Sequence, residues 1–272
     1  MKLLQKTWGV LFREGLLNFI KRKRTKMFME NAFAFTMNYK NLKTKILLRR
    51  RFGHVDEMIL KYGIYEQEIV DDIFEELDNT KNLIDIGANI GQHSLLLAPF
   101  AKNVYSFEPL PDVFEQFQKS INLNHYTNVH AYNIAISDKK EEKKFNYVRY
   151  SAGTSSFIAM ENTTASEITV QTNLLENVLK DVKIDVIKLD VEGYEAVVIL
   201  GNKDKISKDK PVIFLEYSPE WILREGSFSP FDLVDFFHQN DYEIYSRNEK
   251  RIIEKNDVKL EGQDNWTVKI KS

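Results

Sequence analysis

The sequence predicts an α/β fold, in which helices cover a mostly parallel sheet of seven strands. Short apolar runs alternate with helix-length segments over residues 67–246. One of these runs, Leu83–Gly87, leads through a turn with a second glycine into a helix. The chain of 272 residues is 43% hydrophobic and 29% charged, which is typical of a globular protein with a sizeable core. Together these observations favour one large α/β domain with an appended segment.

The first half of the expected sheet follows a single helix whose residues 69, 70, 73, 74 and 77 are apolar and share one face. Alternating strands and helices after it predict right-handed crossovers between parallel strands. The predicted elements are a helix at Gln67–Leu77, strand one at Leu83–Gly87, a helix at Gly91–Phe100, strand two at Asn103–Glu108, a helix at Pro111–Leu123 and strand three at Val129–Ala135.

The pattern changes between residues 137 and 172, where charged, small and then alternating residues predict hairpin-like strands or loops at the carboxyl edge of the sheet. The regular alternation then resumes, and the last two strands are expected to form a hairpin. The predicted elements are a short helix at Asn173–Leu179, strand four at Ile184–Asp190, a helix at Glu192–Leu200, strand five at Val212–Tyr217, a helix at Phe231–Asn240, strand six at Tyr242–Ser246 and a closing strand at Trp266–Ile270.

Residues 1–60 are predicted to be a basic N-terminal extension, and residues 61–272 the main domain. Residues 1–55 contain fourteen Lys and Arg and two Glu, a net charge of +12, so the remainder carries −14. Such asymmetry indicates either an anionic partner, such as a membrane surface, or a segment that folds onto its own acidic domain. An amphipathic helix over residues 1–26 is expected to end in the basic run Lys21–Lys26. One or two strands are expected near Tyr39–Leu48, before a turn at Phe52-Gly53.

The composition also limits the cellular compartments in which the protein is expected. The chain has no cysteine, which excludes disulfides and Cys-ligated zinc. It has no uncharged apolar stretch of about 18 residues, so no transmembrane helix is expected, and residues 3–20 do not resemble a signal peptide. We expect a cytoplasmic protein, with residues 1–26 available for contact with the inner membrane face.

The ends of strands one and two carry the first candidate site residues. In open α/β sheets, ligands bind beyond the carboxyl ends of the strands, and the Gly87–Gly91 turn stands at such an end. Glycine permits positive φ and close backbone approach to a ligand. Glu108, at the end of strand two, is placed to accept hydrogen bonds from both ribose hydroxyls of a nucleoside. The alternative is that Glu108 only caps the helix that begins near Pro111.

Strand four ends in three carboxylates within six residues, Asp190, Glu192 and Glu195. Crowded like charges raise one another's pKa, which is a feature of functional sites. Acidic residues in a first helical turn also favour the helix dipole, which gives Glu192 and Glu195 a purely structural alternative. Asp190, at the strand end beside the expected crevice, is the stronger candidate. Ser155, Glu216 and His93 are further candidates.

Four motifs in this order resemble the FkbM family of S-adenosylmethionine-dependent methyltransferases. The resemblance covers residues 60–220, and the segment Tyr62-Gly63-Ile64-Tyr65-Glu66 is similar to the one that precedes the first motif in that family. One departure concerns the Thr-Leu-Asp triplet of many members, which is replaced here by Thr172-Asn173-Leu174. The motifs are Ile84-Asp85-Ile86-Gly87-Ala88-Asn89-Ile90-Gly91, Phe107-Glu108-Pro109, Asn122-Leu123-Asn124 and Ile184-Asp185-Val186-Ile187-Lys188-Leu189-Asp190-Val191-Glu192-Gly193-Tyr194-Glu195.

The resemblance implies a class I methyltransferase fold of the Rossmann-like type, with strand order 3-2-1-4-5-7-6 and S-adenosylmethionine as cofactor. It also implies transfer to hydroxyl oxygens of sugars or polyketides. Glu108 would hold the ribose. The methionine part would be surrounded by Asp85, Gly87, Asn89 and Gly91, and the adenine would lie near Ala135, Ile136 and Ser137. Ala88 and Asp190 are further expected cofactor-binding residues.

A protonated hydroxyl is a poor nucleophile, so a general base or a cation that lowers its pKa is useful. Our hypothesis assigns this role to Asp190 or Glu192, acting as the base or as a ligand of a divalent cation such as Mg²⁺, with Glu216 as a third catalytic candidate. Asp190-Val191-Glu192-Gly193 lacks the prolines of many amino-group methyltransferases, which favours oxygen acceptors.

Three functions stay open at this point. The first is methylation of a hydroxyl in a polysaccharide, lipopolysaccharide or other glycoconjugate. The second is RNA 2′-O-methylation, in which basic clusters in the N-terminal extension would contact phosphates; the acidic remainder of the chain disfavours nucleic acid as a partner. The third is a scaffold without catalysis on a methyltransferase fold, which the intact glycines and acidic residues disfavour. The sequence does not indicate the oligomeric state.

Overall fold

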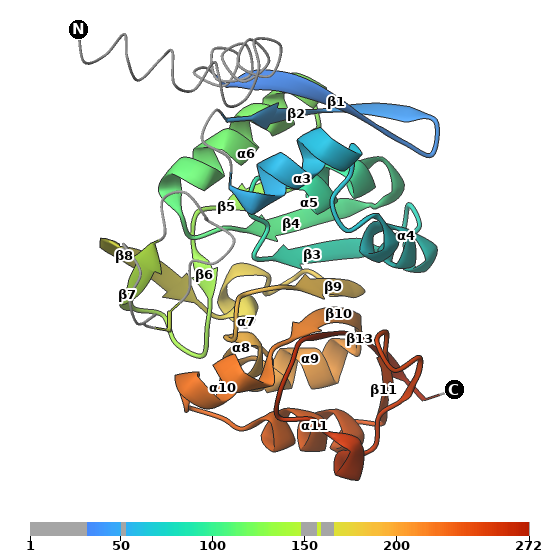
Figure 1. The fold of residues 1–272 in the computed structure, drawn as a ribbon, viewed down its shortest axis with the longest axis vertical. Coiled ribbons are helices and arrows are strands. Elements are labelled where there is room, and N and C mark those ends of the chain that lie inside the picture. Colours follow the sequence, from blue (N-terminus) through green and yellow to red (C-terminus); the bar gives the residue numbers. More distant parts are fainter. Residues whose placement is uncertain (1–31, 50–52, 148–156, 159–165, 272) are drawn as a thin grey trace, which may run out of the picture.

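The computed structural model describes residues 32–49, 53–147, 157–158 and 166–271, and its centre is a twisted sheet of eight strands (Figure 1). Five neighbouring strands are parallel, and β13 is antiparallel to both of its neighbours. This is the expected order 3-2-1-4-5-7-6 with the two-residue strand β12 added at one edge. In spatial order the strands are β5 (Val129–Tyr132), β4 (Asn103–Phe107), β3 (Asn82–Ile86), β9 (Val186–Leu189), β10 (Val212–Tyr217), β13 (Asp264–Ile270), β11 (Tyr242–Ser246) and β12 (Arg251–Ile252).

The sheet is covered on both faces, because every residue of β3 and β9 is buried. Alternate residues of β3 belong to different apolar clusters: Leu83 joins one, and Ile84 and Ile86 join the other. The first cluster packs under α3 (His54–Tyr62), α4 (Gln67–Glu76), α5 (Gln92–Leu97) and α6 (Pro111–Asn124), and the second under α8 (Glu195–Gly201), α9 (Lys203–Asp209), α10 (Pro219–Glu225) and α11 (Pro230–Gln239).

A two-stranded hairpin precedes the parallel core and packs on α6. It consists of β1 (Phe33–Tyr39) and β2 (Leu42–Leu48), joined by Lys40 and Asn41, which both have positive φ. Its buried Met37, Ile46 and Leu48 join the same apolar cluster as α6, and the backbone N–H of Leu47 donates to Ser120 Oγ at 2.9 Å. The strand expected near Tyr39–Leu48 is therefore β2.

Part of the predicted N-terminal extension lies outside the described residues, namely the helix over residues 1–26 and Phe52 of the expected turn. Contact of residues 1–26 with a membrane and the domain boundary at residue 60 stay predictions. No helix within the described ranges is long and apolar enough to cross a membrane.

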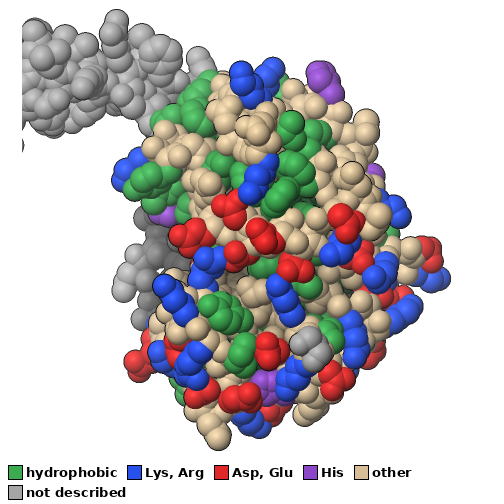
Figure 2. Space-filling view, turned by 90° about the vertical axis from the view of Figure 1, so that its right-hand side faces the viewer, with side chains coloured by type: hydrophobic (Ala, Val, Ile, Leu, Met, Phe, Trp, Pro, Cys, Tyr) green, Lys and Arg blue, Asp and Glu red, His purple; other side chains and the backbone are tan. Residues whose placement is uncertain are grey.

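Ion pairs connect α4 to the C-terminal strands. The helix carries five acidic residues, and Figure 2 shows acidic side chains gathered across the middle of the face that α4 occupies. Arg247, which follows β11, donates to Glu68 at 2.8 Å and also pairs with Asp72. Lys269 of β13 donates to Glu76 at 2.5 Å. Exposed pairs of this kind contribute little to stability singly, and together they link both ends of α4 to the C-terminal strands.

Two expected elements end or begin elsewhere. Strand three stops at Tyr132, because the side chain of Asn133 turns inward and donates to the carbonyl oxygens of Glu108 and Pro109. Ala135–Ile136 instead forms β6, which pairs with β8 (Ser166–Asn173), itself paired with β7 (Glu142–Tyr147), in a separate small sheet. The helix expected from Glu192 begins at Glu195, because Glu192 and Gly193 have positive φ.

The predicted insertion is confirmed as this small sheet, which lies beyond the end toward which β3 points in Figure 1. The remaining short elements are η1 (Ala98–Phe100), α7 (Leu175–Val178) and η3 (Lys255–Asp257). The helices α3, α9 and α10 were not predicted from the sequence.

Candidate active site

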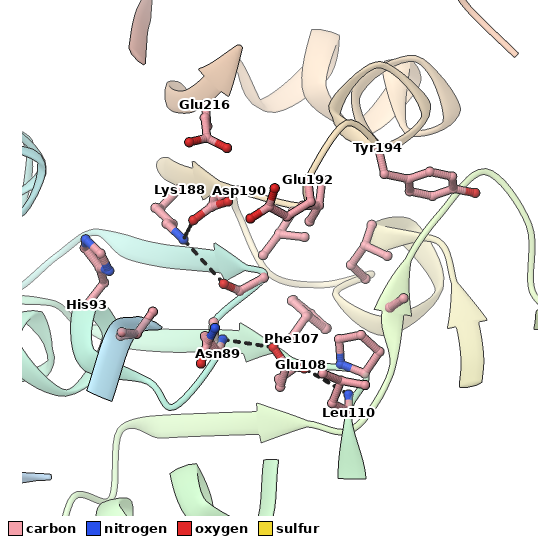
Figure 3. Close-up of a pocket in the computed structure, with 18 of the residues that line it drawn as sticks. Asn89, His93, Phe107, Glu108, Leu110, Lys188, Asp190, Glu192, Tyr194 and Glu216 are labelled. Atoms are coloured by element: carbon pink, nitrogen blue, oxygen red, sulfur yellow. Dashed lines mark hydrogen bonds and ion pairs between the residues drawn. The ribbon is translucent and has the colours of Figure 1, made fainter. Parts of the chain in front are cut away.

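A cavity of about 370 Å³ opens at the carboxyl ends of the parallel strands, within the size range of small-molecule sites (Figure 3). It is lined by the turn after β3, by the ends of β4, β9 and β10, and by the small sheet. Of the candidates predicted from the sequence, the following line it: Gly87, Ala88, Asn89, Glu108, Ala135, Ile136, Asp190, Glu192, Glu216 and His93. Asp85, Gly91 and Ser137 lie behind the lining, and Ser155 is outside the described residues.

The two glycines of the turn after β3 are required by their backbone conformation and by close packing against neighbouring residues. Gly87 and Gly91 have φ of 80° and 82°, values that residues other than glycine rarely adopt. A Cβ on Gly87 would lie 1.8 Å from the carbonyl oxygen of Asp190, and one on Gly91 would lie 2.0 Å from the Phe117 ring. The glycines thus let β3 approach β9 and α6, and this approach shapes the cavity wall.

Glu108 presents a buried carboxylate to the cavity. Its oxygens accept hydrogen bonds from the backbone N–H groups of Asn89 and Leu110, both at 2.9 Å (Figure 3). Burial raises the pKa of Glu108 to about 7, although these bonds oppose the rise. Each carboxylate oxygen has a second lone pair, so Glu108 retains the capacity to accept two ribose hydroxyls. The bond to Leu110 also holds the residue that precedes α6, which is a structural role, and ribose binding by Glu108 stays a prediction.

The cavity beyond Glu108 is apolar. Ser137 is fully buried behind it, where its hydroxyl contacts Asp138 Oδ1 at 3.0 Å and Tyr194 Oη at 2.9 Å. An aromatic base would find flat apolar contacts here and few polar ones. The lining residues at this end are Phe107, Leu110, Ala135, Ile136, Phe145 and Phe157.

Lys188 joins the turn after β3 to the acidic residues after β9. Its Nζ lies 3.1 Å from Asp190 Oδ2, 3.4 Å from the Gly87 carbonyl oxygen and 4.0 Å from Asp85 Oδ1. Burial alone would lower the pKa of Lys188, but the charges of Asp190 and Asp85 raise it above its ordinary value. Lys188 was not among the site residues predicted from the sequence, although a lysine inside the apolar run of strand four is a signal of a specific role.

Asp85 is fully buried, which raises its pKa, and its Oδ2 accepts a hydrogen bond from Ser94 Oγ at 2.5 Å. The carboxylate therefore contacts the cavity only through Lys188. Within the described residues, Asp85 Oδ1 has no hydrogen-bond partner.

Three carboxylates gather at the polar end of the cavity. Asp190, Glu192 and Glu216 each place an oxygen within 4.8 Å of the others, an arrangement that is able to hold a metal ion. Burial, followed by the charge of Asp190, raises the pKa of Glu192 to about 8 and that of Glu216 to about 9. Each of these two carboxyl groups therefore holds its proton more tightly than an exposed glutamate does.

Glu195 holds the turn that carries Glu192. It is fully buried and accepts hydrogen bonds from the backbone N–H groups of Gly193 at 3.0 Å and Val191 at 3.3 Å. Glu192 has φ of 53°, an uncommon conformation for a residue with a long side chain, and such conformations cluster at functional sites.

The comparisons with known proteins agree with this geometry. Residues 85–244 match the family described as the methyltransferase FkbM domain. The hexuronic acid methyltransferase AglP of Haloferax volcanii is 28% identical over 136 residues, which are 50% of this chain and 56% of the relative. The match thus spans little more than half the relative's length.

Solved structures show lower identity. Methyltransferase FkbM of Methylobacillus flagellatus has a TM-score of 0.45 at 15% identity, over 70% of this chain and 44% of that one. SMU.1697c of Streptococcus mutans, solved in complex with SAH, has a TM-score of 0.43 at 11% identity, over 74% of this chain and 95% of that one. Because the family match covers more than half of the sequence, the chain belongs to the FkbM family of S-adenosylmethionine-dependent methyltransferases.

Proposed function

We propose that the protein transfers a methyl group from S-adenosylmethionine to a hydroxyl of a sugar in a polysaccharide, lipopolysaccharide or other glycoconjugate. The observation that carries this proposal is the carboxylate group of Asp190, Glu192 and Glu216, which borders the same cavity as Glu108 and the Gly87 turn.

The cavity fits the expected donor. Glu108 would accept the ribose hydroxyls, the apolar end would take the adenine, and the methionine part would lie along the turn at Gly87, Ala88 and Asn89. When bound, the donor supplies a methyl group on a sulfonium, which is already a strong electrophile. The protein then needs mainly to align the acceptor and to deprotonate its hydroxyl.

Two versions of that deprotonation are supported by the three carboxylates. In the first, Asp190 or Glu192 takes the hydroxyl proton as general base. In the second, Asp190, Glu192 and Glu216 ligate a divalent cation such as Mg²⁺, which lowers the pKa of the bound hydroxyl. The proximity of the three oxygens supports both versions equally.

A glycan acceptor is supported by the relative whose name is hexuronic acid methyltransferase. The acidic lining of the cavity disfavours RNA, whose phosphates would be repelled from the site.

The test is a methyl-transfer assay with radiolabelled donor on sugar nucleotides, extracted glycolipids and RNA. We expect transfer to a saccharide, and a loss of about 100-fold or more in kcat for Asp190→Asn or Glu192→Gln. Glu220→Gln, an exposed change on α10, is the matched control. Full activity in both site variants overturns the catalytic assignment, and transfer to RNA alone overturns the glycan acceptor. Calorimetry without donor binding would support the scaffold function instead.

A further inference from the structure

A second polar group lines the cavity, and the proposed chemistry does not use it. It consists of Glu66, at the start of α4, and His93, in the first turn of α5. Figure 3 places His93 and Tyr194 at opposite ends of the cavity, with Lys188 and Asp190 between them. His93 therefore lies away from the apolar end that fits an adenine.

The position of Glu66 is enforced by its neighbours. The side chain of Gln92 binds both polar backbone groups of Tyr65: it accepts from the N–H and donates to the carbonyl, each at 2.7 Å. Glu66 itself has φ of 49°, although it is not a glycine. A strained backbone that is held by a specific side chain is typical of positions whose orientation matters for binding.

His93 is neutral and incompletely hydrogen-bonded. It is 6% exposed, and burial, followed by the charge of Lys188, lowers its pKa well below the ordinary value. Its Nε2 lies 3.8 Å from Glu66 Oε2, which is too long for a hydrogen bond, and within the described residues this nitrogen has no hydrogen-bond partner. A buried nitrogen without a partner, on a residue that lines a cavity, points to a ligand that supplies one.

The surroundings define the chemistry of that ligand. Glu66, Asp190 and Glu216 offer oxygen acceptors, and the nearest cation, Lys188, is already engaged by Asp190 and the Gly87 carbonyl. A carboxylate on the ligand would meet like charge here. Hydroxyl groups fit, because each can donate to a carboxylate and also exchange a hydrogen bond with a neutral imidazole.

Four residues of this end of the cavity also line a smaller neighbouring recess. Glu66, Lys188, Asp190 and Glu216 line a second recess of about 20 Å³, whose other walls include Arg247, Asn265 and Thr267.

We propose that Glu66 and His93 form an acceptor subsite that binds hydroxyl groups of an uncharged sugar ring, next to the hydroxyl that is methylated. This inference rests on the proposed function and extends it. Recognition of the acceptor would then involve Glu66, which lies just before α4 and outside the acidic motifs at the ends of strands one, two and four.

The kinetic test separates acceptor binding from donor binding. In Glu66→Gln and His93→Phe, we expect the KM for a neutral methyl glycoside to rise about tenfold or more, with the SAH Kd within about twofold of the original protein. His93→Gln restores a polar group near the Nε2 position and should recover part of the KM. Glu75→Gln, an exposed change on the same helix, is the matched control.

A second measurement needs no activity. The chain has five histidines, so their ring signals can be resolved by NMR and that of His93 identified by its loss in His93→Phe. In protein saturated with SAH, a neutral glycoside should shift the His93 signal and leave those of His125 and His238 in place. The matching uronide should shift it less.

The outcomes distinguish the two proposals. A His93 shift with sugar but no methyl transfer retains the subsite and overturns the proposed reaction. Methyl transfer to a sugar with unchanged KM in Glu66→Gln and no His93 shift overturns the subsite alone. A weakened SAH Kd with unchanged acceptor KM shows that the pair serves the donor, and equal or better binding of the uronide overturns the neutral class; both results contradict the inference.

Discussion

The carbonyl oxygen of Asp190 lies where a methyl group on Gly87 would have to be, at 1.8 Å from the ideal Cβ position. The backbone N–H of Asp190 also donates to the carbonyl of Ile86 at 3.1 Å. The end of β9 and the turn after β3 are therefore in direct contact, so the expected catalytic carboxylate and the expected donor turn cannot move independently.

Gly87→Ala should weaken both donor binding and the stability of the fold. The added methyl group forces the two strand ends apart, so we expect SAH affinity to fall at least about tenfold and Tm to fall by several degrees. Calorimetry and thermal unfolding measure the two effects. Gly262→Ala is the control, because Gly262 has the same φ of 80° with nothing within 4 Å of the added carbon. Equal losses in both variants would show that backbone strain, rather than the contact with Asp190, is responsible.

Lys188→Met should be strongly destabilising, because it leaves Asp85 buried without its nearest cation. Breaking a buried ion pair from one side costs about 3–5 kcal/mol. The loss of Lys188 raises the pKa of Asp85 further, so the variant should regain stability as the pH falls and Asp85 takes up a proton. Urea unfolding at pH 7 and pH 5 measures this. Lys119→Met, which removes an exposed pair with Glu115, should change stability by less than about 1 kcal/mol. A pH-independent loss at Lys188 would contradict the electrostatic explanation.

Glu108→Gln should weaken donor binding by about tenfold or more, because hydrogen bonds from ribose hydroxyls to an ionised carboxylate become bonds to a neutral amide. In the original protein, SAH affinity should rise between pH 6 and pH 8, as the carboxyl group with a pKa of about 7 loses its proton. The variant should lack this rise. Calorimetry across that range measures both, with Glu115→Gln on α6 as control; a pH-dependent rise that survives in Glu108→Gln would assign it to another group.

The cluster of Asp190, Glu192 and Glu216 should make the stability of the protein depend on pH above neutrality. The folded chain binds the protons of Glu192 and Glu216 more tightly than the unfolded chain does, because the pKa of a glutamate in the unfolded chain is the ordinary 4.5. Their contribution is therefore complete below about pH 4.5 and is lost as the pH rises through about 8 and 9. Tm should fall from pH 6 to pH 9, less steeply in Glu216→Gln but unchanged in slope in the exposed control Glu243→Gln.

Addition of millimolar Mg²⁺ at pH 9 extends that experiment. A rise in Tm that Glu216→Gln lacks supports cation ligation over the general-base version. An absence of any rise favours the general base, since a bound cation would offset the repulsion among the three carboxylates.

The central strands of the main sheet could be predicted from the sequence because they are apolar runs buried on both faces, whereas the order of the strands came from the resemblance to the FkbM family. The positions of Asp190 and Glu108 followed, since parallel strands end at one edge. Strand three was predicted too long, because the apolar pair Ala135–Ile136 continues the pattern past Asn133, and only the tertiary bonds of Asn133 reveal the break.

Other site residues could not be predicted, because they depend on contacts between distant segments. Glu66 reaches the cavity only because Gln92 holds Tyr65, and no local pattern encodes that bond. Glu192 was assigned to a helix because acidic residues favour helix starts, whereas Glu195 binds the backbone of the turn and delays the helix by three residues.

The last strand of the chain, β13, is an interior strand that lies between β10 and β11. Val268 pairs with Ile213 on one side and with Ile244 on the other. During synthesis, β11 and α11 therefore emerge before the strand that attaches them to the sheet. A chain that is cut before residue 264 leaves β10 as an open edge with unpaired backbone groups, which is a template for aggregation. Loss of residues 264–272 would therefore open this edge of the sheet, although none of these nine residues lines the main cavity.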